Sequence, residues 1–288
     1  MTKNSRFRPK EQGRDRPSSG PKHAQPWKAK GPRPGRDERP SDGTTWIYGV
    51  HAVLAALGNP KRKVLEVRAT RNMLESHGEA AIDPAKVTLT DGESLSALLP
   101  PGAVHQGIAA RVQPLEGVRL DQALPEADGI ALILDQVTDP QNIGAIFRSA
   151  AAFGARAIIQ QDRKAPPITG SLAKAAVGGI EVVPDVRVVN IAQTIAELSQ
   201  DGWTTIGLSG DAEHDLHEVL DGSPVVLVMG AEGKGLRQLV GTRCDRLARI
   251  PIHPHMESLN VSAATAIALY AAHMAQLSRS NAVKTPTP

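Results

Sequence analysis

The sequence is poor in several residue types and patterns, and each shortage excludes a class of protein. Its 288 residues include a single cysteine, so neither an internal disulfide nor a cysteine-based metal cluster can form. Aromatic residues make up only 3%, so a core has to be built from Ala, Val, Leu and Ile. No apolar run approaches the roughly 20 residues of a membrane-spanning helix, and the N-terminus lacks the apolar segment of a secretory signal. We therefore expect a soluble, cytoplasmic protein with no membrane partner.

Basic charge is concentrated in residues 1–43. This segment has 12 Lys and Arg against 5 Asp and Glu, whereas the whole chain has 33 against 30. The segment also has seven Pro, five Gly and no Val, Ile or Leu, so it cannot bury enough apolar surface to offset its ordering entropy. We predict a disordered arm that binds RNA or DNA by releasing counterions, although a solubilising or targeting tail would have a similar composition.

The remaining chain has the pattern of two α/β domains joined by a linker. In residues 44–113, the pattern of residues 46–57 predicts a short lead-in followed by an amphipathic helix, and strands are predicted at 64–69, 87–89 and 107–112. Residues 114–128 have the composition of a linker, residues 129–280 form the second predicted domain, and residues 281–288 are expected to fray.

The second domain alternates strands with helices. Strands are predicted at 130–134, 157–160, 182–183, 204–208, 225–229 and 247–252, and helices at 144–153, 171–177, 191–199 and 261–277. Strands that are apolar on both faces, alternating with helices, predict an α/β fold with a mostly parallel sheet covered by helices.

Three polar segments each follow an apolar strand of this domain: residues 135–144 (DQVTDPQNIG), 230–237 (GAEGKGLR) and 251–260 (PIHPHMESLN). Ligands bind beyond the carboxyl ends of parallel strands, so a shared site is expected there. The glycines of 230–235 match neither the dinucleotide fingerprint nor the P-loop. His253 and His255 have no third ligand at metal-binding spacing, so no metal is expected.

Five polar residues of these segments are candidates for catalysis, and each also has an ordinary structural interpretation. Arg148 could be a salt-bridged arginine on a core helix, Glu232 a turn carboxylate, and Ser258 and Asn260 helix caps. Asn142 completes the set. Three backbone-exposing segments at strand ends together favour a binding crevice.

Together the three segments resemble the three motifs of the SpoU (TrmH-like) RNA ribose methyltransferases of the SPOUT superfamily. The resemblance rests on Asn142-x5-Arg148, on GAEGKG at 230–235 and on IxPxMxSLNVS at 252–262. YGxHAV at 48–53 and HQG at 105–107 extend it to the small domain of the branch that modifies guanosine in 23S rRNA.

The resemblance implies transfer of a methyl group from S-adenosyl-L-methionine to a ribose 2′-hydroxyl, by a trefoil-knotted domain. It implies that Arg148 acts on the hydroxyl, supported by Asn142, Glu232, Ser258 and Asn260. Residues implied to hold the cofactor are Gly230, Gly235, Ile250, Ile252, Met256 and Leu259.

The same resemblance implies an L30e-like fold for the small domain, which would bind the RNA substrate, and a homodimer formed through the knot region. A guanosine of large-subunit rRNA is the expected target. Two alternatives stay open at this point: a tRNA guanosine 2′-O-methyltransferase, and a ribosome-assembly factor that binds RNA without catalysis.

Overall fold

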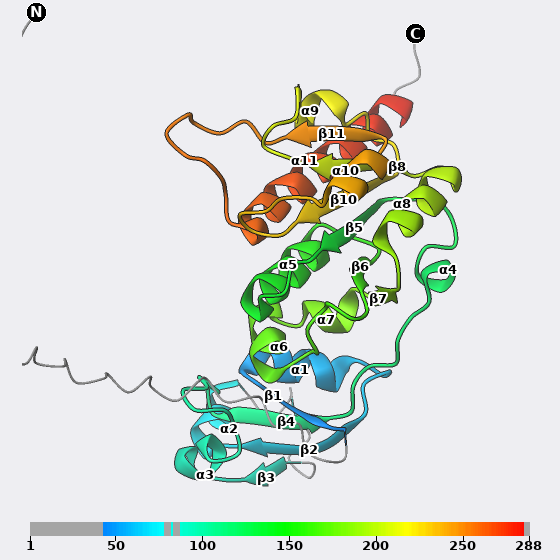
Figure 1. The fold of residues 1–288 in the computed structure, drawn as a ribbon. Helices are drawn as coiled ribbons and strands as arrows, with labels where there is room; N and C mark the ends of the chain where they lie inside the picture. Colours follow the sequence, from blue (N-terminus) through cyan, green and yellow to red (C-terminus); the bar gives the residue numbers. More distant parts are fainter. Residues whose placement is uncertain (1–42, 78–81, 83–86, 285–288) are drawn as a thin grey trace, which may run out of the picture. The chain divides into compact units, whose positions relative to one another are not determined.

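The computed structural model describes residues 43–77, 82 and 87–284, which form two β-sheets with surrounding helices (Figure 1). The predicted disordered arm, apart from Gly43, lies outside the described residues, as do residues 285–288 of the predicted frayed end. Within the described ranges, no helix is long and apolar enough to cross a membrane.

The first sheet has four strands in the order β1-β4-β2-β3, with β4 antiparallel to β1 and β2. Side chains alternate along these strands, so Val67 and Ile108 point into a core that also contains Val53 of α1. We call residues 44–113 the four-stranded region. Its elements are β1 (Thr45–Tyr48), α1 (Val50–Gly58), β2 (Val64–Ala69), α2 (Arg71–His77), β3 (Val87–Leu89), α3 (Gly92–Ser96) and β4 (Ile108–Val112).

The second sheet has seven parallel strands in the order β7-β6-β5-β10-β8-β11-β9. We call residues 129–284 the seven-stranded region. The elements from residue 114 onward are α4 (Leu120–Ala123), β5 (Ile130–Asp135), α5 (Pro140–Ala152), β6 (Ile158–Gln161), α6 (Gly170–Ala176), α7 (Gly179–Val182), β7 (Asp185–Val188), α8 (Ile191–Gln200), β8 (Thr204–Leu208), β9 (His214–Asp215), α9 (Leu216–Val219), β10 (Val225–Gly230), α10 (Gln238–Arg243), β11 (Arg246–Arg249) and α11 (Val261–Lys284).

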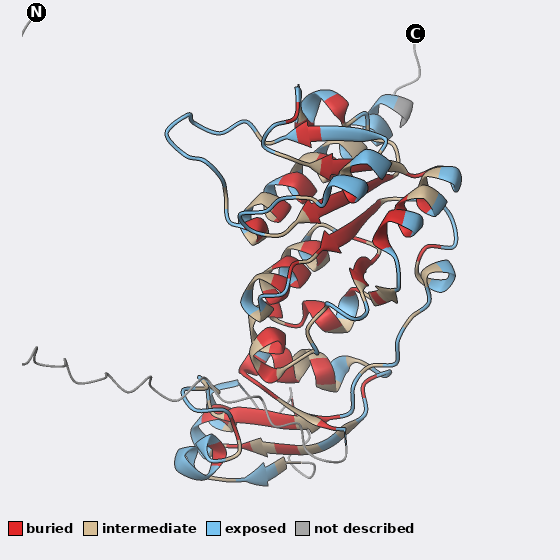
Figure 2. Ribbon diagram, viewed as in Figure 1, coloured by how far each residue is buried: buried red, intermediate tan, exposed pale blue. Residues whose placement is uncertain are grey.

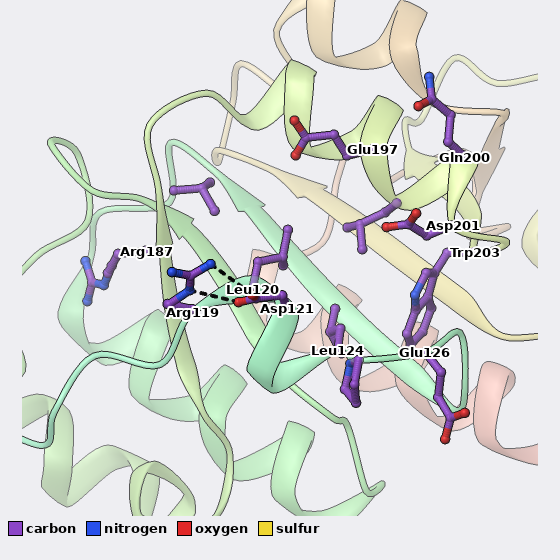
Figure 3. Close-up of a pocket in the computed structure, with 13 residues that line it drawn as sticks. Arg119, Leu120, Asp121, Leu124, Glu126, Arg187, Glu197, Gln200, Asp201 and Trp203 are labelled. Atoms are coloured by element: carbon purple, nitrogen blue, oxygen red, sulfur yellow. Dashed lines mark hydrogen bonds and ion pairs between the residues drawn. The ribbon is translucent and has the colours of Figure 1, made fainter.

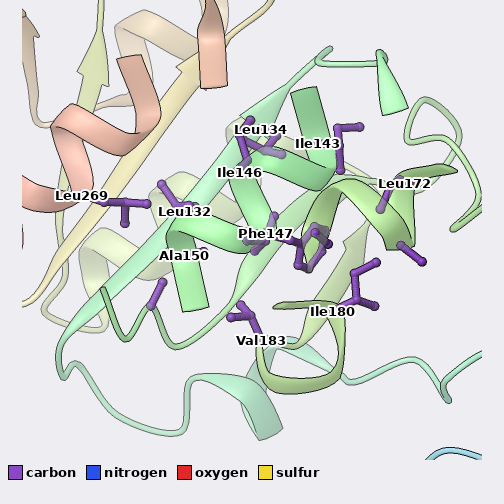
Figure 4. Packing of buried hydrophobic residues seen from close by; sticks show 14 of the residues in the cluster. Leu132, Leu134, Ile143, Ile146, Phe147, Ala150, Leu172, Ile180, Val183 and Leu269 are labelled. Atoms are coloured by element: carbon purple, nitrogen blue, oxygen red, sulfur yellow. The ribbon is translucent and has the colours of Figure 1, made fainter. Parts of the chain in front are cut away.

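Helices cover both faces of this sheet, which explains why its central strands are apolar throughout. In β5, Leu132 belongs to a cluster with Phe147 of α5, while Ile133 belongs to a second cluster with Ile195 of α8. Figure 4 shows Phe147 surrounded by side chains of β5, α6 and the α7 segment. The buried residues follow the strands and the inner faces of the helices (Figure 2). The expected α/β fold with a mostly parallel sheet is confirmed.

One strand was assigned to the wrong residues. Val182 closes α7 and Val183 caps it, whereas the strand is β7, which begins at Asp185. A pair of valines fits either element, and β7 has a single buried side chain, Val186, among half-buried ones, so it lacks the long apolar run of the central strands.

Some helices and strands begin or end at residues other than those predicted, and in α5 the reason is helix capping. Helix α5 begins at Pro140 instead of residue 144, because the Asp139 carboxylate accepts hydrogen bonds from the amides of Gln141 (2.8 Å) and Asn142 (2.9 Å). Strand β11 ends at Arg249, before Pro251. The predicted linker contains the short helix α4, and α11 runs on to Lys284. The segment before α1 is a strand, β1.

Candidate active site

The three polar segments meet at one edge of the seven-stranded sheet. Strands β5, β10 and β11 run in the same direction, so the segments that follow them leave the sheet at the same edge. One residue from each segment joins a hydrogen-bonded trio: Asn142, Glu232 and Asn260. The predicted convergence of the three motifs is therefore a feature of the structure.

The trio is held together by side-chain amides that donate to oxygens. The amide nitrogen of Asn260 donates to Glu232 Oε1 at 2.7 Å and to Asn142 Oδ1 at 3.0 Å. The amide of Asn142 donates to Glu232 Oε2 at 3.4 Å. Each carboxylate oxygen of Glu232 thus accepts one bond, and each still has a lone pair available for another donor.

Asn260 and Asn142 are positioned by the start of a helix. The side-chain oxygen of Asn260 accepts from the amides of Ser262 (2.9 Å) and Ala263 (3.3 Å), so it caps α11 while its nitrogen serves the trio. Asn142 lies in the first turn of α5, where Asp139 is the cap. The capping interpretation of Asn260 is confirmed, and the same side chain also joins the trio, because its oxygen caps the helix while its nitrogen donates to Asn142 and Glu232.

Glu232 lies on a short loop that closes on itself. Ala231 and Gly235 form an antiparallel bridge, and a Cβ on Gly230 would lie only 2.2 Å from the carbonyl carbon of Gly235. No side chain other than hydrogen fits at Gly230, because the loop returns directly over it.

An ion pair with a buried carboxylate anchors the base of the same loop. Asp135, at the end of β5, is 1% exposed, and its carboxylate accepts from the backbone amide of Arg237 (3.1 Å) and from its guanidinium Nε (2.7 Å). Sequence reasoning left both residues out of the predicted site. The signal was a single acidic residue at the end of an otherwise wholly apolar strand, since such a buried charge requires a partner.

Arg148 and Ser258 do not join the trio. Arg148 is six residues beyond Asn142 on α5, a rise of about 9 Å, and its side chain is exposed. Neither side chain makes a hydrogen bond or ion pair with any residue that the structure describes. Both are therefore accessible to a ligand.

The residues implied to hold a cofactor lie along the ends of β10 and β11. Gly230 ends β10, and Gly235 closes the loop after it with a φ of +63°. On the third segment, Ile250 and Leu259 are half-buried, while Ile252 and Met256 are exposed. Those two exposed apolar side chains are accessible to a ligand.

A surface cavity of about 750 Å³ lies between the segment around α4 and the seven-stranded region (Figure 3). It is lined by residues of α4, β7 and α8, with Trp203 and the ion pair between Arg119 and Asp121 at its wall, and it contains no predicted site residue. Among the described residues, no group of three His, Cys, Asp or Glu side chains could hold a metal ion.

Two family models match the chain. The model of the SpoU rRNA methylase family matches residues 129–270, and the model described as RNA 2′-O ribose methyltransferase substrate binding matches residues 46–118. Each of the two regions is therefore matched by a family model whose description names RNA methylation or an RNA methyltransferase.

Curated relatives match both regions in one alignment. The chain is 38% identical over 242 residues to the 23S rRNA (guanosine-2′-O-)-methyltransferase RlmB of Vibrio vulnificus, which spans 79% of this chain and 95% of the relative. It is 38% identical over 234 residues to RlmB of Ralstonia nicotianae, spanning 78% and 94%.

Solved structures have the same fold. The AdoMet-bound rRNA methyltransferase of Sinorhizobium meliloti aligns with a TM-score of 0.68 and 26% identity, covering 81% of this chain and 88% of that one. The SpoU methyltransferase AviRb of Streptomyces viridochromogenes aligns with a TM-score of 0.71 at 22% identity, covering 85% and 94%, which shows a shared fold. Sequence motifs, trio geometry and relatives agree, and the chain belongs to the SpoU rRNA methylase family.

Proposed function

We propose that this protein transfers a methyl group from S-adenosyl-L-methionine to the ribose 2′-hydroxyl of a guanosine in 23S rRNA. The observation that carries the proposal is the trio of Asn142, Glu232 and Asn260, which unites one residue from each family motif. Relatives named for this activity are matched over 95% of their length, so the chain contains counterparts of both their regions.

The chemistry of the residues at the ends of β10 and β11 fits this methyl donor. Met256 and Ile252 offer exposed apolar surface suited to the adenine ring, and Ile250 and Leu259 flank them along the same segment. Gly235 is exposed with open space beside it, so its backbone is accessible to polar groups of the donor, and Gly230 allows the loop to fold back over the end of β10. When bound, S-adenosylmethionine supplies an electrophilic methyl group.

The chain's own residues orient the ribose and stabilise charge. A guanidinium is essentially never deprotonated in a protein, so Arg148 does not act as a literal base. It is exposed and free of protein partners among the described residues, so it can bind an RNA phosphate and stabilise the charge that develops on the ribose oxygen. Glu232 accepts a hydrogen bond from the ribose hydroxyl at a remaining lone pair, the exposed Ser258 offers a further hydroxyl to the substrate, and the ribose proton leaves to phosphate or water.

The proposal includes a homodimer. Ile267, Tyr270, Met274 and Leu277 are 41–54% exposed and recur at spacings of three and four along α11, so they form one apolar stripe. Exposed stripes of this kind mark protein interfaces, and α11 directly follows the third motif. We expect Tyr270→Glu to yield a monomer by light scattering, while an unchanged oligomeric state would contradict this interface.

The remaining features follow from the family resemblance and from the substrate. They are a trefoil knot in the seven-stranded region, an L30e-like fold and an RNA-binding role for the four-stranded region, and a cytoplasmic location where rRNA is modified. The substrate-binding model that matches residues 46–118 supports the RNA-binding role.

A transfer assay with radiolabelled S-adenosylmethionine tests the function. Purified protein is offered unmodified large-subunit rRNA and tRNA in separate reactions, and alkali-resistant ribose linkages are then mapped. We expect label at one guanosine of the rRNA. Label in tRNA alone would contradict the substrate, and binding of S-adenosylmethionine without any transfer to rRNA, free or in ribosomal particles, would contradict catalysis and favour an RNA-binding assembly factor.

A further inference from the structure

The junction between α6 and α7 packs closely against the four-stranded region on one side and against α5, the helix that carries Arg148, on the other. A Cβ on Gly178 would lie 2.7 Å from the Cβ of Ala55 in α1. A Cβ on the next residue, Gly179, would lie 2.5 Å from the carbonyl oxygen of Phe147 and 3.0 Å from the amide nitrogen of Arg148. The junction thus contacts α1 on one side and the α5 backbone at Arg148 on the other.

The backbone of this junction is strained. Val177 has a φ of +51°, and Gly178 has a φ of +91°. A β-branched residue in the left-handed region is a genuine outlier, and such a conformation persists only where the surroundings enforce it. The packing on both sides of the junction therefore determines its shape.

A buried ion pair ties this junction to the four-stranded region. Glu181 of α7 accepts from the guanidinium of Arg62 at 2.6, 3.0 and 3.1 Å, and their side chains are 7% and 3% exposed. The amide of Asn59 donates to the same carboxylate at 2.8 Å, and Arg62 also donates to the carbonyl of Gln113 at 2.9 Å. The contact is directional as well as buried.

Stability is a weak explanation for a buried pair of this kind. The desolvation of two charges offsets much of their attraction, and buried pairs can often be replaced by apolar residues without loss of stability. A bidentate fork, by contrast, tolerates little displacement of either partner. Stability alone therefore gives no reason for a charged pair at this contact.

We propose that Glu181 is a positioning residue for methyl transfer: through Arg62 and Asn59 it sets the position of the four-stranded region relative to Arg148. The inference rests on the proposed function, because it takes the four-stranded region as the RNA-binding part and Arg148 as the residue that acts on the ribose. A nucleotide held by the four-stranded region then reaches Arg148 only when the contact is formed.

The proposal separates catalytic rate from affinity. A misplacement of about 1 Å far from the reacting atoms can cost about 100-fold in rate. We expect loss of the pair to lower kcat by about that factor, with RNA and S-adenosylmethionine dissociation constants within about twofold of wild type. Methylation of nucleotides other than the normal target is also expected.

The test uses the full chain with Glu181→Gln and with the double variant Arg62→Met, Glu181→Leu. The double variant leaves no unpaired buried charge, so it is expected to keep the wild-type melting temperature. Asp121→Asn is the matched control, because it breaks the exposed pair with Arg119 at 2.9 Å. Steady-state kcat on unmodified 23S rRNA is compared with both affinities.

Reduced kcat in the stable double variant, with affinities retained, supports positioning. Recovery of wild-type kcat together with stability in that variant would overturn it, because the pair would then be merely structural. Hydrogen exchange of the α5 amides around Arg148, measured without RNA, gives a second readout that is independent of activity. Faster exchange in the double variant but not in Asp121→Asn is expected, and unchanged exchange would overturn the mechanical link even if the wild type proved inactive on rRNA.

Discussion

The two functions of Asn260 can be separated by one substitution, Asn260→Asp. A carboxylate retains the oxygen that caps α11 but has no proton to donate to Glu232 or Asn142. It also places a second negative charge beside Glu232, where the amide now lies 2.7 Å away. We expect the helix to keep its stability while the trio comes apart.

The expected loss follows from the contacts. A hydrogen bond to a charged group contributes about 1.5–3 kcal/mol, and the exposure of Asn260 favours the lower end of that range. Two carboxylates about 4 Å apart add about 1 kcal/mol of repulsion in a water-like environment. If the trio orients the ribose, a loss of about 2–3 kcal/mol lowers the transfer rate by about 30- to 150-fold.

Initial rates of methyl transfer and thermal unfolding are measured on the same preparations. Asn190→Asp is the matched control, because Asn190 also caps a helix through its side-chain oxygen, accepting from the amide of Gln193 at 3.3 Å, and it contributes nothing to the trio. Asn260→Ser tests loss of the amide without added charge. A wild-type rate in Asn260→Asp, or an equal loss in Asn190→Asp, would refute the reasoning.

Three further outcomes are expected. Arg148→Ala should abolish turnover and leave S-adenosylmethionine affinity, measured by calorimetry, nearly intact, because the guanidinium acts on the RNA. Loss of both turnover and affinity would contradict this assignment. Wild-type activity in Arg148→Lys would show that the planar guanidinium is dispensable. Burial, with the charges of Asp245 and Asp135, raises the pKa of Cys244 to about 12, so iodoacetamide at neutral pH should alkylate this thiol only after unfolding in urea, and rapid labelling of folded protein would contradict its burial. Burial alone would raise the pKa of Asp245, but hydrogen bonds from Thr205 and Ser199 outweigh it and hold that pKa below its ordinary value, so the stabilisation is present above the unfolded pKa and is lost as pH falls through the folded one. Asp245→Asn should lower the urea midpoint at neutral pH, and its difference from wild type should shrink as pH falls through the lowered pKa of the folded state; a pH-independent difference would contradict this.

The spacing of apolar residues predicted most of the helices and strands, because it reflects which side chains of a segment are buried. Strands 64–69, 87–89 and 204–208 have the bounds predicted, since their apolar side chains alternate or run continuously according to the faces they cover. The misassigned pair Val182 and Val183 shows the limit, because two apolar residues at a helix end carry no period. Helix α5 begins four residues before its predicted start for a similar reason. The hydrogen bonds that the Asp139 carboxylate accepts from backbone amides define this start, and a hydrophobic pattern does not report them.

The sequence by itself determined the three polar motifs, the α/β pattern and the unusual composition of residues 1–43. Only the tertiary structure decided which motif residues touch. It joined Asn142, Glu232 and Asn260, left Arg148 and Ser258 outside that trio, and paired Asp135 with Arg237 and Arg62 with Glu181, which lie 102 and 119 residues apart. Periodicity reports what one segment buries, whereas such pairs depend on the order in which parallel strands and their helices stack, and that order is set by the whole chain.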